Sequence, residues 1–271
     1  MFNYDKYIRK DKFPHIWCSG CGNGIILKSS IRAIDKIGWD KNDVMTISGI
    51  GCSSRATGYL DFDSLHTLHG RALAFATGIK MAKPKMNVVV FTGDGDAGAI
   101  GGNHLIHAAR RNIDITAVIF NNNIYGMTGG QYSPTTPQEF VATTAPYGHI
   151  ENSFNFMELA IGAGASFAAR TTVTNPKQVE NFIHKGLENK GFSVIEVVSN
   201  CHVQFGRRNE MKSPIQMFDW IKERIIPMSK AEDMSEDELE NKVITGVFKN
   251  IEKPEYVEEY DKNIMAKAEG E

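Results

Sequence analysis

The chain has 271 residues, enough for one or two domains of ordinary size. Its composition, 42% apolar and 23% charged with a formal net charge of −2, argues against a disordered protein, a disulfide-stabilised miniprotein and a broadly basic nucleic-acid-binding protein. No apolar run approaches the roughly 18 residues that cross a bilayer, and the polar start shows no signal-peptide pattern. We therefore expect a cytoplasmic protein that binds neither membrane nor nucleic acid.

The first 200 residues alternate helical patterns with short β-branched runs. Asn175-Pro176 begins one helix, because a capping residue precedes a proline at the first helical position, and Gly191 can end it. The alternation predicts an α/β fold with a mainly parallel sheet and helices on both faces. The other helices are expected at 24–37, 70–82 and 99–111, and the strands at 44–48, 88–92, 115–120 and 194–199.

The C-terminal part of the chain differs in charge from the rest. Residues 229–271 carry 13 acidic and 6 basic side chains, a net charge of −7. We therefore expect one cofactor-binding domain at 1–228 and a charged C-terminal extension at 229–271. The extension is either a solvated amphipathic segment or an arm that packs on a partner subunit.

Glycine-rich and polar sequences follow four of the predicted strands, beginning at Gly49, Gly93, Asn121 and Asn200. Ligands of open α/β sheets bind at the carboxyl ends of the strands. Four such sequences at one edge predict a binding site.

The sequence from Gly93 to Gly98 fits the pattern G-x-G-x-x-G between a strand and a helix. A nicotinamide site also needs an acidic residue at the end of the next strand, and this strand ends in Asn121, Asn122 and Asn123. A carboxylate at Asp94 would repel a bare diphosphate but would suit one that is bridged by Mg²⁺. The pattern therefore resembles a thiamine diphosphate motif, with Asp94 and Asn122 flanking the cation.

Helix N-termini favour diphosphate, and the helix after this turn begins near Gly95 and Asp96. The backbone N–H groups of these two residues are therefore expected to face the cofactor.

Four cysteines lie in three loops, at Cys18, Cys21, Cys52 and Cys201. One C-x-x-C pair with two isolated cysteines suits a [4Fe–4S] cluster, a zinc ion or four unligated thiols. A neighbouring thiamine site favours the cluster, because oxidation there needs an electron acceptor within reach.

Taken together, these motifs resemble the β subunits of the 2-oxoacid:ferredoxin oxidoreductases, in particular the 2-oxoglutarate group. The resemblance runs from about Phe13 to Gln216. It is carried by five segments, 15–24, 49–53, 67–72, 93–96 and 121–131.

The resemblance implies a set of site residues. His69 would position substrate or stabilise charge, as the candidate catalytic residue. The cluster ligands would be Cys18, Cys21, Cys52 and Cys201, and the Mg²⁺ ligands Asp94, Asn122 and the backbone carbonyl of Ile124. The thiamine diphosphate contacts would be Ile50, Gly51, Cys52, Ser53, His69, Gly95, Asp96, Gly126 and Met127.

The resemblance also implies a reaction, the coenzyme A-dependent oxidative decarboxylation of 2-oxoglutarate to succinyl-CoA and CO₂. Electrons would pass through the cluster to ferredoxin. In this family an α subunit supplies the glutamate that helps to activate thiamine, and no acidic residue here stands in an obvious place for it. We therefore expect the chain to act only in a hetero-oligomer with an α subunit, with or without further small subunits.

Other functions remain open at this stage. Residues 126–137 resemble the 2-oxoglutarate branch, but pyruvate or another 2-oxoacid is an alternative substrate. A non-oxidative thiamine decarboxylase, a nicotinamide-dependent dehydrogenase and a zinc-stabilised scaffold subunit are the alternative classes.

Overall fold

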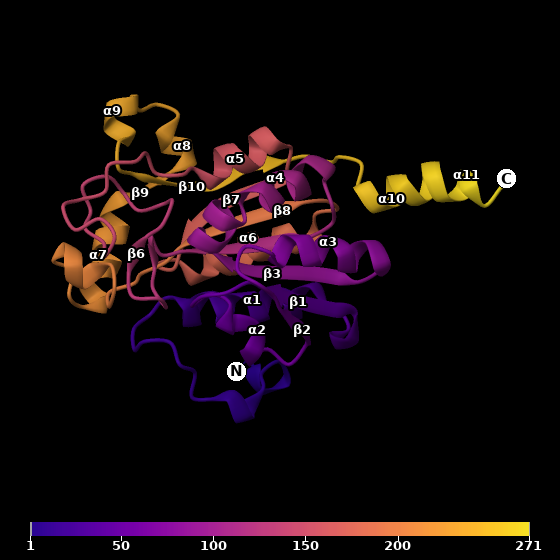
Figure 1. Ribbon diagram of the computed structural model, residues 1–271, viewed down its shortest axis with the longest axis horizontal. Coiled ribbons are helices and arrows are strands. Elements are labelled where there is room, and N and C mark those ends of the chain that lie inside the picture. Colours follow the sequence, from indigo (N-terminus) through magenta and orange to yellow (C-terminus); the bar gives the residue numbers. More distant parts are fainter. Residues whose placement is uncertain (1, 271) are drawn as a thin grey trace.

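A computed structural model describes residues 2–270. Its main sheet has eight strands in the order β2-β1-β3-β4-β8-β7-β10-β9 (Figure 1). The strands are β1 (Val44–Ser48), β2 (Asp63–His66), β3 (Asn87–Gly93), β4 (Thr116–Asn121), β7 (Phe167–Thr172), β8 (Ser193–Val198), β9 (Ile225–Pro227) and β10 (Val243–Asn250). A separate two-stranded hairpin is formed by β5 (Ile124–Tyr125) and β6 (Gln131–Tyr132).

The central strands run in parallel. Each of the neighbouring pairs β2–β1, β1–β3, β3–β4, β4–β8 and β8–β7 is parallel, and only β10 is antiparallel to its neighbour β7. This confirms the predicted mainly parallel sheet. Because β1, β3 and β4 are adjacent, the loops after them meet at one edge.

Helices cover both faces of the sheet, as predicted. The longer helices are α1 (Asn23–Ile37), α3 (Ala72–Ala82), α4 (Gly102–Arg111), α5 (Phe156–Ala163), α6 (Pro176–Glu188) and α7 (Pro214–Arg224). The short ones are α2 (Arg55–Tyr59), α8 (Met228–Ala231), α9 (Glu236–Leu239), α10 (Tyr256–Tyr260) and α11 (Ala266–Ala268).

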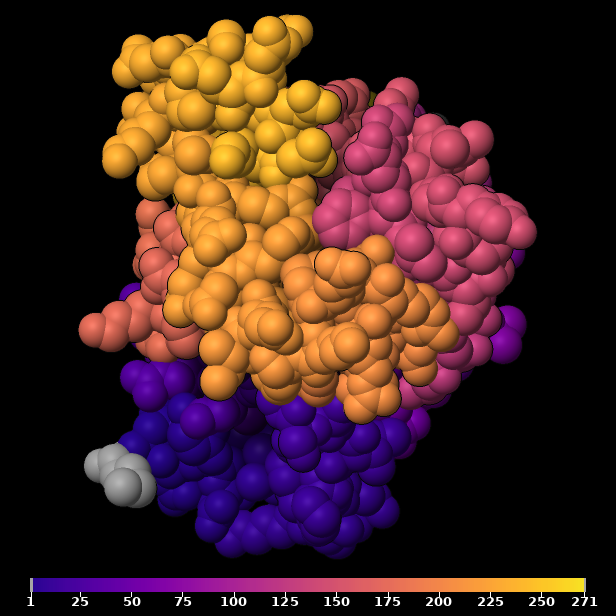
Figure 2. Space-filling view, turned by 90° about the vertical axis from the view of Figure 1, so that its left-hand side faces the viewer, coloured from indigo at the N-terminus to yellow at the C-terminus, as the bar shows by residue number. Residues whose placement is uncertain are grey.

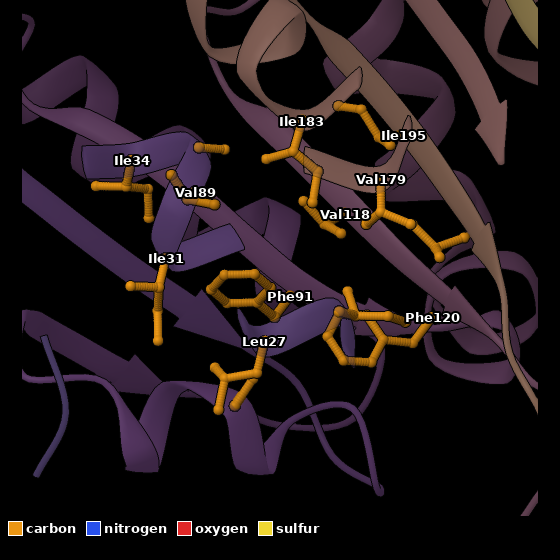
Figure 3. Close-up of a cluster of buried hydrophobic side chains, with 14 of the residues drawn as sticks. Leu27, Ile31, Ile34, Val89, Phe91, Val118, Phe120, Val179, Ile183 and Ile195 are labelled. Atoms are coloured by element: carbon orange, nitrogen blue, oxygen red, sulfur yellow. The ribbon is translucent and has the colours of Figure 1, made fainter. Parts of the chain in front are cut away.

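Alternate residues of the central strands point into two separate cores, as the period of a β-strand requires. Phe91 and Val118 pack under α1 and α6, next to Leu27 and Ile183 (Figure 3). The intervening residues, such as Val90, pack under α3, α4 and α5 on the other face. The sheet is therefore buried on both sides, which explains the uninterrupted apolar runs in its sequence.

The predicted elements agree closely with the observed ones, with some exceptions. The strand at 44–48 is reproduced to the residue, and Asn175 caps α6 by accepting a hydrogen bond from the amide of Gln178. The helix expected at 99–111 is interrupted: a π-helical turn spans Gly95–Ile100, and α4 follows it. α6 ends at Glu188, three residues before Gly191.

Four strands of the main sheet, β2, β7, β9 and β10, carry no clear sequence signal. β2 is mostly exposed, β9 has 3 residues, and β7 has small Ala and Thr residues and Arg170 after Phe167, so none of them shows a strong apolar pattern. β10 includes Gly246 and lies in the acidic C-terminal region.

The segment 229–271 contributes to the sheet through β10, which pairs with β7. Beyond β10, the first residues of α10 pack against the body of the molecule, where Val257 is buried. The chain then leads away from the body through α11 (Figure 1). Among residues 2–270, no helix is both long enough and apolar enough to span a membrane.

Candidate functional site

The carboxyl ends of β1, β3 and β4 border one cleft. It is lined by all nine residues expected to contact thiamine diphosphate and by all three expected to hold Mg²⁺. The cleft also includes five residues that were not predicted, which are Asn23, Gly93, Phe120, Tyr125 and Thr128. The structure thus brings together the residues that four separate sequence segments supply.

Asp94 stands at the end of β3 with a buried carboxylate. Burial raises its pKa to about 6, and this rise is opposed by hydrogen bonds from Ser133, Thr135 and nearby backbone N–H groups. Its oxygen Oδ2 accepts hydrogen bonds from Ser133 Oγ at 2.6 Å and Thr135 Oγ1 at 2.7 Å. Oδ1 faces the Asn122 amide instead.

The Asn122 amide has two possible orientations, which exchange its oxygen and nitrogen. In one, the nitrogen donates to Asp94 Oδ1 at 3.2 Å and to the Ile124 carbonyl at 2.7 Å. In the other, the Asn122 amide oxygen faces Asp94 Oδ1 and the Ile124 carbonyl oxygen, and no hydrogen atom lies between these three oxygens. Oxygens on adjacent corners of a Mg²⁺ octahedron lie roughly 2.9 Å apart, so the second orientation suits a cation at this place.

Asp96, which also lines the cleft, has a buried side chain. It accepts hydrogen bonds from the Gly70 amide at 2.6 Å and the Thr92 hydroxyl at 2.8 Å, and it contacts His69 Nδ1. A carboxylate can only accept here, so the contact places the proton on Nδ1 of His69. Asp96 therefore fixes the orientation of the His69 ring, which lines the cleft.

The hairpin β5–β6 closes the cleft on the side of β4. Tyr125 donates a hydrogen bond from its hydroxyl to the Gly95 carbonyl at 3.1 Å, and burial raises its pKa to about 12. A Cβ atom at Gly95 would lie 2.2 Å from the Tyr125 ring. Position 95 therefore needs glycine for close approach of this ring.

The four cysteines line a second cavity, of about 280 Å³. Cys18 is exposed and the other three are partly buried. The loop at 17–21 packs against Pro214, since a Cβ at Gly20 would lie 2.4 Å from that ring. Figure 2 shows the segment around residues 200–225 (orange) lying against the N-terminal part of the chain (indigo).

Three of the four cysteines have surroundings that disfavour the thiolate form. Burial raises the pKa of Cys21 to about 12 and that of Cys52 to about 11, and the neighbouring cysteines raise both further. The same cause raises the pKa of Cys201. In the cofactor-free chain these groups are thiols, and they must lose protons to bind any metal.

Within residues 2–270, no three His, Cys, Asp or Glu side chains lie close enough together to hold one metal ion. A zinc ion draws four thiolates to about 2.3 Å from its centre.

The two cavities share a wall, made of Cys52, Asn122, Gly126 and Met127. A Cβ at Gly126 would lie 3.5 Å from the sulfurs of both Cys52 and Cys201. The Trp17 indole donates to the Cys52 carbonyl at 2.7 Å and holds this loop in place. A group in one cavity is thus next to a group in the other.

Several residues that line or support the site were given no role by the sequence. Trp17 and Tyr125 stand inside motifs that were identified, but those motifs gave no role to their side chains. Ser133 and Thr135 lie in a loop that was interpreted only as a marker of substrate choice. Arg55 follows the Cys52 motif and lines the cysteine cavity, and its buried Nε has no hydrogen-bond partner in the described chain.

Comparison with known proteins gives consistent matches. Residues 49–197 match the family described as thiamine pyrophosphate enzyme, C-terminal TPP binding domain. The chain is 56% identical to the 2-oxoglutarate synthase subunit KorB of Methanocaldococcus jannaschii, over 96% of each chain. It is 49% identical to the subunit of the same name from Archaeoglobus fulgidus, over 99% of this chain and 97% of the relative.

A solved structure is also similar. It is a 2-oxoglutarate:ferredoxin oxidoreductase from Magnetococcus marinus with 2-oxoglutarate, coenzyme A and succinyl-CoA bound. The match has a TM-score of 0.87 and 34% sequence identity, over 99% of this chain and 91% of that one.

Proposed function

Because the chain belongs to the thiamine pyrophosphate enzymes and, among them, to the KorB subunits of 2-oxoglutarate synthase, we propose that it is the β subunit that binds thiamine diphosphate, Mg²⁺ and one [4Fe–4S] cluster. With an α subunit it would convert 2-oxoglutarate and coenzyme A to succinyl-CoA and CO₂ and reduce ferredoxin. The observation that carries this proposal is the shared wall between the two cavities.

The proposed cation ligands are Asp94, Asn122 and the Ile124 carbonyl. Their support is the group of three oxygens that forms when the Asn122 amide oxygen faces the other two, at 3.2 and 2.7 Å. Mg²⁺ commonly takes few protein ligands and completes its shell with phosphate oxygens and water.

Thiamine diphosphate, when bound, supplies the electron sink that decarboxylation requires. This chain's part would be to hold the diphosphate near the backbone of Gly95 and Asp96 and to orient His69 through Asp96. With its proton on Nδ1, His69 keeps Nε2 available to substrate. It would position substrate or stabilise developing charge.

The need for an α subunit is supported by the size of the cleft. Its volume is about 70 Å³, whereas sites that enclose small molecules measure roughly 300–1,000 Å³. The cleft is therefore too small to enclose the cofactor by itself, which favours a partner that completes the pocket.

We propose that residues 1–228 form the cofactor-binding unit. Residues 229–271 lie outside the site as a C-terminal extension, which contributes β10 to the main sheet.

The proposed cluster ligands are Cys18, Cys21, Cys52 and Cys201. Their support is that all four line one cavity, because a four-iron cluster is held by four thiolates. The cluster, when bound, would accept electrons one at a time and pass them to ferredoxin. Four thiols that must stay reduced before loading suit a cytoplasmic location.

The substrate is proposed to be 2-oxoglutarate, because the relatives and the similar structure carry that name. The test is the turnover of the assembled complex under anaerobic conditions, with ferredoxin reduction as the readout. We expect 2-oxoglutarate to be used well and pyruvate poorly. The chain alone should show no turnover.

Asp94→Ala should abolish turnover. The matched control is Asp11→Ala, which removes an exposed carboxylate near the N-terminus, outside the site. Equal use of pyruvate would refute the substrate proposal. Full activity of Asp94→Ala would refute the cation site, and turnover by the single chain would refute the need for a partner.

A further inference from the structure

The two oxygens of the Asp94 carboxylate have separate surroundings. Oδ1 faces Asn122, at 3.2 Å from its amide. Oδ2 is contacted by two hydroxyls of the loop after β6, those of Ser133 at 2.6 Å and Thr135 at 2.7 Å. Both hydroxyl-bearing residues are buried, at 1% and 3% exposure. One oxygen is thus held by the protein and the other faces the proposed cation ligands.

The hairpin brings these hydroxyls to Asp94. Ile124 pairs with Tyr132 across the hairpin. Ser133, the residue after Tyr132, therefore lies next to Asp94 at the end of β3. The same short segment therefore supplies the Ile124 carbonyl on one strand and two hydroxyl donors after the other.

The loop has its own closing bonds, which do not involve Asp94. Asn123 donates from Nδ2 to the Thr135 carbonyl at 2.6 Å, and Thr136 donates from its hydroxyl to the Asn123 carbonyl at 2.7 Å. The Ser133 amide donates to the Thr136 hydroxyl at 2.8 Å. The loop therefore does not need the hydroxyls of Ser133 and Thr135 to close.

Thr135 has one hydroxyl proton and three acceptors within reach. They are Asp94 Oδ2 at 2.7 Å, Asn121 Oδ1 at 2.8 Å and Ser133 Oγ at 3.2 Å. A carboxylate is the stronger acceptor because it is charged. Asn121 Oδ1 also accepts a hydrogen bond from the Asn123 amide at 3.1 Å, so it still has a donor when the Thr135 hydroxyl points to Asp94.

We propose that Ser133 and Thr135 are positioning residues for the cation of the thiamine site. By holding Oδ2, they prevent the Asp94 carboxylate from rotating and keep Oδ1 directed toward Asn122 and Ile124. The inference rests on the proposed magnesium site. It gives residues 133–135 a role that is separate from substrate choice.

The expected effect follows from the usual behaviour of groups that orient metal ligands. Losing such a group weakens metal binding roughly 10- to 100-fold. We expect Ser133→Ala and Thr135→Val each to weaken cation binding by about tenfold, and the double variant by more. Thr135→Ser keeps the hydroxyl and should bind as the wild type does.

The experiment measures Mn²⁺ binding to the assembled complex in the presence of thiamine diphosphate. The electron paramagnetic resonance signal of free Mn²⁺ reports the unbound ion and does not depend on turnover. Thr136→Val is the matched control, because it breaks two of the three loop-closing bonds and leaves both hydroxyls on Asp94. Circular dichroism checks the fold of each variant.

Weaker Mn²⁺ binding in Ser133→Ala and Thr135→Val, with recovery in Thr135→Ser, would support the inference. Wild-type affinity in both variants would overturn it. An equal loss in Thr136→Val would also overturn it, because loop structure alone would then explain the effect. Failure of the wild-type complex to bind Mn²⁺ would refute the magnesium site itself.

Discussion

Asp96 joins three segments that border the cleft, and its removal should destabilise the fold. Its carboxylate accepts hydrogen bonds from the Gly70 amide at 2.6 Å and the Thr92 hydroxyl at 2.8 Å, and a longer one from the Ile50 amide at 3.4 Å. It also holds the ring of His69. The perturbation is Asp96→Ala, which removes every one of these acceptors.

The size of the effect follows from the donors that are left without partners. The Gly70 and Thr92 bonds are buried, and a buried donor without an acceptor costs about 1–3 kcal/mol. Two such donors give about 4 kcal/mol of lost stability. Since 1 kcal/mol shifts the melting temperature of a domain of about this size by roughly 2–4 °C, Asp96→Ala should lower it by about 8–16 °C.

Asp96→Asn is the informative companion variant. Its remaining oxygen can still accept from Gly70, and its NH₂ group can donate to the Thr92 hydroxyl, which is able to reverse its role. We expect a smaller loss, of about 1–2 kcal/mol, because a charge-assisted bond becomes a neutral one.

The assay is thermal unfolding of the purified cofactor-free chain, followed by circular dichroism, with Asp11→Ala as the exposed control. Asp96→Ala should melt lowest, Asp96→Asn should lie between it and the wild type, and the control should match the wild type. If the melting temperature of Asp96→Ala lies within 2 °C of that of the wild type, the carboxylate does not stabilise the fold by linking the three segments.

Three further predictions concern the site and the sheet behind it. Burial raises the pKa of Asp94 to about 6, so below that pH a cation must displace a proton from the carboxyl group. The affinity of the complex for Mn²⁺ should therefore be constant above about pH 6 and fall below it. An affinity that is unchanged at pH 5 would contradict this. Gly95→Ala places a Cβ 2.2 Å from the Tyr125 ring and should weaken thiamine diphosphate binding in calorimetry, with part of the loss recovered when Tyr125→Ala is added. Arg170→Met leaves Glu196 buried without its partner at 2.6 Å, which should cost about 3–5 kcal/mol in denaturant unfolding; a loss below 1 kcal/mol would show that the pair is dispensable.

The sequence was most informative where one residue pattern has one structural meaning. The uninterrupted apolar runs at 88–92 and 115–120 are typical of strands buried on both faces, and β3 and β4 occupy those positions. The motifs that follow such strands must meet at one sheet edge. The gathering of Asp94, Asn122 and Cys52 around one cleft was predictable for that reason.

The sequence was less informative where distant contacts decide the structure. β7 pairs with β10, which lies more than 70 residues further along the chain, and neither has a strong apolar pattern. The hydrogen bonds of the Asp96 carboxylate to Gly70 and Thr92 were also missed, because a motif locates backbone groups and does not say which rotamer a carboxylate adopts.

The loop at 133–135 illustrates the same limit for the site. Its two hydroxyls reach Asp94 only because the hairpin turns the chain back toward β3. Neither the helical nor the strand periodicity of the sequence predicts that this hairpin turns the chain back toward β3.

The most direct test of the proposed function is the content of iron, acid-labile sulfide and zinc in the anaerobically purified chain. We expect about four irons and four sulfides per chain, and both should be lost together in Cys52→Ser, at the wall between the two cavities. One zinc per chain with no sulfide would refute the proposed function, because the four cysteines would then be structural and the thiamine site would have no electron acceptor beside it.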